Sequence, residues 1–123
     1  MNENTINSLR EALKHSPDNA TLRLLLADTL SALGRFDEAE DEYTFVLKTH
    51  SNTKAKTGLA KVFYGKGNYS ACNVILEELI ESGKQDIEIF TLYAKGLLKE
   101  NSLNKAIEIY QKVLTIDPGY FVH

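Results

Sequence analysis

The chain has 123 residues, of which 43% are hydrophobic and 25% charged, and its formal net charge is −3. This composition is typical of one small globular domain. A net negative charge gives no overall basic field, so we predict that nucleic acid is not a partner. The single cysteine excludes an internal disulfide and fits a reducing compartment. No apolar run reaches the roughly 20 residues that span a bilayer. The first 14 residues contain no uninterrupted apolar stretch and do not form a secretory signal, so we predict a cytoplasmic protein without a membrane partner.

The first predicted element is a lone helix over residues 4–16. Ile6, Leu9 and Leu13 recur at helical spacing along it, and Pro17 follows directly. A lone amphipathic helix cannot bury its apolar stripe by itself. We therefore expect this helix to cap the element that follows it.

Three helix–turn–helix units are predicted next, over residues 20–52, 53–85 and 86–120. The second helix of each unit carries one small anchor residue, and these residues (Ala39, Cys72 and Ala106) lie 33 and 34 positions apart. Apolar residues follow each anchor at positions +4, +7 and +8, which form one face of an α-helix. A regular period of this length is typical of a helical solenoid.

The first helix of each unit repeats as well. Small residues at positions 27, 60 and 94 each lie 12 positions before the anchor. A close antiparallel helix pair has room only for small side chains where the two backbones approach each other. Gly34, Gly67 and Asn101 follow these helices and can adopt the left-handed conformation that ends a helix. The segment 65–68 is therefore predicted as a turn, although Gly65, Lys66 and Gly67 superficially resemble a phosphate loop.

These units resemble tetratricopeptide repeats, and unit 86–120 resembles the family pattern most closely. The matching residues there are Phe90, Tyr93, Ala94, Leu97, Ala106, Tyr110 and Pro118. The other two units depart from the pattern, with Arg23 at the first aromatic position and Cys72 at the second-helix alanine. The resemblance implies an all-α fold: a right-handed α-solenoid of three repeats after a half-repeat capping helix, forming a single domain over residues 1–123.

The sequence shows no constellation of catalytic residues. The three histidines lie far apart and lack partners at metal-ligand spacing, so we predict no metal, no cofactor and no enzymatic activity. Cys72 occupies a packing position and is interpreted as an inert buried thiol. Gly58, inside a predicted helix, has no explanation from the sequence.

The family resemblance also implies a concave groove, lined by the first helices, in which a protein partner inserts a peptide segment. The positions implied for this groove are Asp28, Lys54, Thr57, Lys61, Tyr64, Thr91, Lys95, Leu98 and Lys99. The lysines suggest a site for an acidic or carboxylate-bearing peptide, and the alternative is a solvated lysine face. Repeats that clamp chaperone C-termini carry Lys, Asn and Arg in the groove, whereas this chain has Leu24, Asp28, Gly58, Glu88 and Leu92 there. A clamp of that kind is therefore not expected.

Two further features leave alternatives open. The acidic run Asp37, Glu38, Glu40, Asp41 and Glu42 is interpreted as a solvated convex face, with a cation site or docking patch as the alternative. The apolar end of the third unit is either covered by its own C-terminal tail, continued in a longer protein or paired with a second copy in a homodimer. The residues proposed for self-association are Tyr110, Val113, Leu114, Tyr120 and Phe121. A weaker resemblance to the repeat region of bacterial AAA proteins suggests the N-terminal adaptor domain of a larger ATPase.

Overall fold

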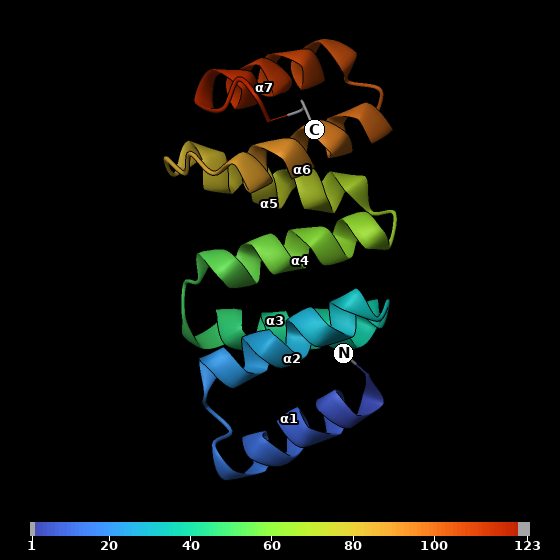
Figure 1. Ribbon diagram of the computed structural model, residues 1–123, viewed down its shortest axis with the longest axis vertical. Coiled ribbons are helices and arrows are strands. Elements are labelled where there is room, and N and C mark those ends of the chain that lie inside the picture. Colours follow the sequence, from blue (N-terminus) through green and yellow to red (C-terminus); the bar gives the residue numbers. More distant parts are fainter. Residues whose placement is uncertain (1, 121–123) are drawn as a thin grey trace. The chain divides into compact units, whose positions relative to one another are not determined.

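The computed structural model describes residues 2–120, and these residues form helices and no strand (Figure 1). The helices are α1 (Glu3–His15), α2 (Ala20–Ala32), α3 (Phe36–Thr49), α4 (Thr53–Gly65), α5 (Tyr69–Glu81), α6 (Ile87–Lys99) and α7 (Leu103–Ile116). The all-α fold predicted from the sequence is confirmed. None of the described helices is both long enough and apolar enough to cross a membrane.

Short polar side chains begin most of these helices. Asn19, Asn52 and Asn68 each accept a hydrogen bond from the backbone N–H three residues later, and Asp86 accepts one from Glu88 N–H. Each bond satisfies one of the N–H groups that the first helical turn leaves without a partner. The helix boundaries are therefore set locally by the sequence.

The turns inside the predicted units depend on left-handed backbone. Gly34 and Gly67 have φ angles of 77° and 81°, and Asn101, which is not a glycine, also has a positive φ of 61°. Glycine adopts this conformation without a steric penalty, and asparagine tolerates it better than most residues. The predicted helix ends at these three positions are confirmed.

The chain divides into two compact units, Met1–Lys66 and Gly67–His123, so the boundary falls between the two helices of the second predicted repeat. In the first unit α2 packs against α1 and α3, and α4 packs against α3 and α2. Its core includes Ile6, Leu26, Leu30, Tyr43 and Val46. Ala27 and Ala39 are fully buried there, as the repeat pattern predicts.

In the second unit α6 packs against both α5 and α7. Phe90 and Tyr93 of α6 are almost completely buried, as are Ala106 and Val113 of α7. Cys72 is fully buried in α5. Each unit thus buries the small anchor residues that the sequence singled out.

Gly58 is explained by a close helix contact. A Cβ atom at Gly58 would lie 2.4 Å from Cε1 and Cζ of Tyr43, so the ring of Tyr43 occupies the space where a side chain would be. A Cβ atom at Gly65 would similarly lie 2.5 Å from Cζ of Phe36. These two contacts join α3 to α4, and glycine permits the close approach.

Candidate functional site

The groove positions predicted in the first two repeats, residues 20–52 and 53–85, lie on α2 and α4, which pack against each other. Asp28 on α2 is exposed and accepts a hydrogen bond from the hydroxyl of Tyr43. Because the same tyrosine ring covers Gly58 of α4, it ties α2, α3 and α4 together. The Asp28 carboxylate is therefore held in place by the core beneath it.

A basic face lies on α4 itself. Lys54 and Lys61 are exposed, whereas Thr57 and Tyr64 are half-buried. These positions recur at helical spacing and share one side of the helix. Thr57 donates its hydroxyl hydrogen to the carbonyl of Thr53 at 2.9 Å, so its polar group is used within the helix. We call Lys54, Thr57, Lys61 and Tyr64 the α4 face.

The groove positions predicted in the third repeat, residues 86–120, all lie on α6. Lys95, Leu98 and Lys99 are exposed, and Thr91 is half-buried one turn before them. Lys99 Nζ lies 5.9 Å from the centre of the Tyr69 ring, within range of a cation–π interaction. We call Thr91, Lys95, Leu98 and Lys99 the α6 face. The structure thus places four of the predicted residues on α4 and four on α6, while Asp28 lies on α2.

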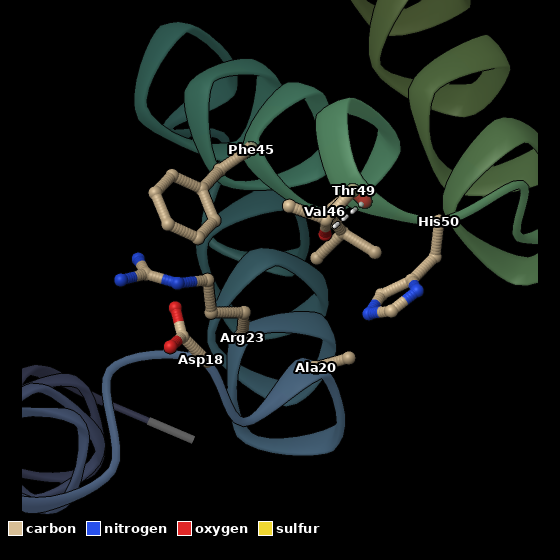
Figure 2. A pocket seen from close by; sticks show the side chains of 7 residues that line it. All are labelled: Asp18, Ala20, Arg23, Phe45, Val46, Thr49 and His50. Carbon is tan, nitrogen blue, oxygen red and sulfur yellow. Dashed lines mark hydrogen bonds between the residues drawn. The ribbon is translucent and has the colours of Figure 1, made fainter.

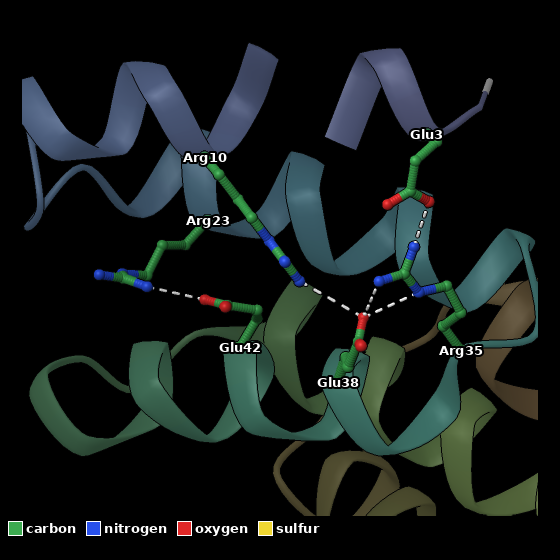
Figure 3. A network of polar contacts seen from close by, with 6 residues as sticks. All are labelled: Glu3, Arg10, Arg23, Arg35, Glu38 and Glu42. Atoms are coloured by element: carbon green, nitrogen blue, oxygen red, sulfur yellow. Dashed lines mark hydrogen bonds and ion pairs between the residues drawn. The ribbon is translucent and has the colours of Figure 1, made fainter. Parts of the chain in front are cut away.

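The acidic run in α3 is largely neutralised by basic side chains (Figure 3). Glu38 contacts Arg10 of α1 at 3.3 Å and Arg35 at 2.6 Å, and Glu42 contacts Arg23 of α2 at 2.7 Å. Lys66 contacts Asp37 at 2.6 Å and Glu40 at 3.0 Å. Among residues 2–120, no group of His, Cys, Asp and Glu side chains is arranged to hold a metal ion.

A cavity of about 320 Å³ was not predicted from the sequence. It opens between the start of α2 and the end of α3 and is lined by Asp18, Ala20, Arg23, Phe45, Val46, Thr49 and His50 (Figure 2). Arg23 stacks on Phe45, with its guanidinium carbon 3.7 Å from the ring centre, and donates to the carbonyl of Pro17. Since Arg23 is also paired with Glu42, its charge is already compensated. The departure from the repeat pattern at Arg23 was the available signal for this arrangement.

The predicted self-association residues are not all on the surface. Val113 of α7 is fully buried, Leu114 is 40% exposed, and Tyr110 and Tyr120 are half-buried. Phe121 lies outside the described residues. Val113 therefore packs inside its own unit, because it faces α6 rather than the open side of the helix. Homodimer formation through this end stays a prediction.

Burial raises the pKa of three weakly acidic groups. The pKa of the Cys72 thiol rises to about 11, first because the group is desolvated and then because Glu100 is negatively charged. The pKa of Tyr43 is raised by burial and by its hydrogen bond to Asp28, and that of Tyr93 mainly by burial. Cys72 is therefore protonated at neutral pH and unreactive.

We expect the chain to lose stability at alkaline pH. The folded state holds these protons more tightly than the unfolded chain, so the stabilisation is complete below the ordinary cysteine pKa of 9.0 and is lost as pH rises towards about 11. Urea denaturation at about pH 8 and about pH 10.5 measures this loss. A Cys72→Ala variant should lose less over the same interval, and an equal loss would contradict the assignment to the thiol.

Short helices paired over small anchor residues define the chain as an all-α helical-repeat protein. Three tetratricopeptide repeat family models match it, over residues 2–44, 24–71 and 87–120. The chain belongs to the tetratricopeptide repeat family.

One curated relative is the DnaJ homolog subfamily C member 3 of Homo sapiens. It is 27% identical over 115 residues, and the alignment covers 80% of this chain but 23% of the human protein. The chain thus spans about a quarter of that relative's length.

Two solved structures share the fold at low sequence identity. The crystal structure of MamA has a TM-score of 0.84 and 21% identity, and the match covers 94% of this chain and 68% of MamA. The first tetratricopeptide repeat domain of Spaghetti (RPAP3), bound to the HSP90 peptide SRMEEVD, has a TM-score of 0.77 and 17% identity. That match covers 83% of this chain and 82% of the other.

Proposed function

We propose that the chain is a non-catalytic scaffold that binds an acidic peptide segment of a protein partner. The observation that carries this proposal is the α4 face, where exposed lysines and a half-buried tyrosine share one side of a helix. Lysines attract carboxylates, and a partly buried aromatic ring supplies rigid contact area at little entropic cost. The α6 face also carries two exposed lysines, but its apolar member is the exposed side chain of Leu98 in place of a tyrosine.

The family supports a scaffold rather than an enzyme. The RPAP3 domain, which shares this fold, is bound to an acidic peptide in its solved structure. The proposed peptide differs from that one in how it is held, because the positions implied for a carboxylate clamp carry Leu24, Asp28, Gly58, Glu88 and Leu92. Asp28 would repel a terminal carboxylate, and its position is fixed by Tyr43. A cytoplasmic location and a role beside an ATPase stay predictions.

Charge reversal on the two faces tests the proposal. Acidic 12-residue peptides are selected from a display library on the intact chain, and their affinities are measured by fluorescence anisotropy. Lys61→Glu and Lys95→Glu are each expected to weaken binding about tenfold, because each replaces an attraction to the acidic peptide by a repulsion. The corresponding loss of binding free energy is about 1.4 kcal/mol. Unchanged affinity in both variants would rule out the two lysine faces.

Two controls accompany this measurement. Lys112→Glu makes the same charge change at an exposed position of α7 and is expected to leave the affinity within about twofold. The peptide SRMEEVD is expected to bind more weakly than the selected peptides, because the chain lacks the clamp residues. Tight binding of SRMEEVD that survives both charge reversals would show a different site.

A further inference from the structure

The cavity of the first unit lies where the last turn of α3 meets the first turn of α2 (Figure 2). Val46, Thr49 and His50 line it from α3 and the C-cap of that helix, and Ala20 and Arg23 line it from α2. The positive end of the α2 dipole and the negative end of the α3 dipole therefore meet at the cavity and oppose each other. The charge that the cavity prefers in a ligand is decided by its side chains.

These side chains leave one negative charge without a partner. The guanidinium of Arg23 lies 2.7 Å from Glu42 and is stacked on Phe45, so its positive charge is compensated. By contrast, the carboxylate of Asp18 makes no hydrogen bond or ion pair with any other residue in the range 2–120. With histidine neutral at pH 7, Asp18 gives the cavity a net charge that attracts a cation.

The segment that carries Asp18 is held in place on both sides. Before it, the carbonyl of Pro17 accepts a hydrogen bond from Arg23 Nε at 3.1 Å. After it, the backbone N–H of Asn19 donates to the carbonyl of Ser16 at 3.1 Å, and the Asn19 side chain caps α2. A carboxylate on a segment that is already ordered loses less conformational entropy when it binds a ligand.

The rest of the cavity is apolar in the middle and polar at the far end. Figure 2 shows Ala20 and Val46 between Asp18 and the ring of His50, and Val46 is only 2% exposed. The His50 side chain is exposed, and a neutral imidazole offers one hydrogen-bond donor and one acceptor. A fitting ligand therefore has a cationic head, an aliphatic stem and a polar group beyond the stem.

We propose that this cavity binds the side chain of a lysine in a partner protein. The ammonium group pairs with Asp18, the stem lies against Ala20 and Val46, and the peptide group of the lysine meets the ring of His50. Lysine fits better than arginine, because its compact ammonium reaches the carboxylate without placing a broad second guanidinium against Arg23. None of these residues belongs to the α4 face or the α6 face, so the inference does not rest on the proposed function.

The proposed site is sensitive to modification of the partner. Acetylation of the lysine removes its positive charge and its ability to pair with a carboxylate. The cavity should therefore distinguish an unmodified lysine from an acetylated one. This difference gives the inference a direct test with two probes that share the same stem and backbone.

The first experiment titrates a lysine probe into the isotope-labelled full chain and follows it by heteronuclear NMR. The probe is Nα-acetyl-lysine methylamide, which carries the side chain on a neutral backbone. Saturable shifts are expected at the amides of residues 18–23 and 46–50, with a dissociation constant of roughly 1 mM. The Nε-acetylated probe should bind at least fivefold more weakly. Equal affinity of these two probes, or tighter binding of the arginine analogue, would overturn the proposal.

Matched variants of the chain then assign the binding to the cavity. Asp18→Asn should weaken binding of the lysine probe at least fivefold, and Ala20→Leu, which fills the cavity from the first turn of α2, should abolish the saturable shifts. Glu81→Gln removes a negative charge from an exposed position of α5 and should leave the affinity unchanged. Circular dichroism checks that each variant is folded. Unchanged affinity in Asp18→Asn would overturn the proposal, whatever Ala20→Leu does to folding.

Discussion

Replacing Leu79 by alanine is expected to lower the free energy of unfolding by about 2–5 kcal/mol. Leu79 lies seven positions after the anchor Cys72 and is only 3% exposed. The substitution removes apolar atoms from a packed interior, and the neighbours relax only partly into the space. Chemical denaturation followed by circular dichroism measures the change.

Val74→Ala on the same helix is the matched control. Val74 is 54% exposed, so its truncation should change stability by less than about 0.5 kcal/mol. Similar losses for the two variants would contradict the packing register of α5. They would also weaken the assignment of Cys72 as the buried anchor of this helix.

Helix positions followed from the sequence because their determinants are local. Asn52 and Asp86 cap helices by bonding backbone N–H groups within a few residues, and Gly34 and Gly67 end helices through their own backbone freedom. The repeat period then located the buried anchors, since a helix hides one side against its neighbour. Each of these signals involves residues close together in the chain.

Contacts between helices were harder to predict because they depend on which side chain reaches which gap. The sequence showed Gly58 as an unexplained glycine, and only the fold places the ring of Tyr43, 15 positions earlier, against it. Arg23 was identified as a departure from the repeat pattern, yet its stacking on Phe45 needs the geometry of α2 and α3. The acidic run looked solvated because its basic partners, including Arg10 and Lys66, lie far away in sequence.

The candidate site could also be predicted only in part, because its residues follow from the repeat pattern but the contacts beneath them do not. The family resemblance implied groove positions at Lys54, Lys61 and Tyr64, and the structure places all three on α4 with both lysines exposed, while their role in binding stays a prediction. The support beneath that face was not visible in the sequence, because the bond from Tyr43 to Asp28 crosses between helices. The same contact makes Gly58 the position at which fold and site can be tested together.

Gly58→Ala is expected to destabilise the chain by about 1–3 kcal/mol, although helix propensity alone favours alanine by about 1 kcal/mol. The new Cβ would lie 2.4 Å from ring atoms of Tyr43, and this ring is 2% exposed and tied to Asp28. The ring therefore has no room to move aside. Urea denaturation gives the sign of the change, and a gain in stability would show that the contact between α3 and α4 is looser than described.

A double-mutant cycle isolates this contact. Tyr43→Leu removes the ring atoms nearest Gly58, so in that background Gly58→Ala should become neutral or stabilising, with a coupling energy of about 1–3 kcal/mol. Additive effects would mean that Gly58→Ala acts through the helix backbone rather than through the ring.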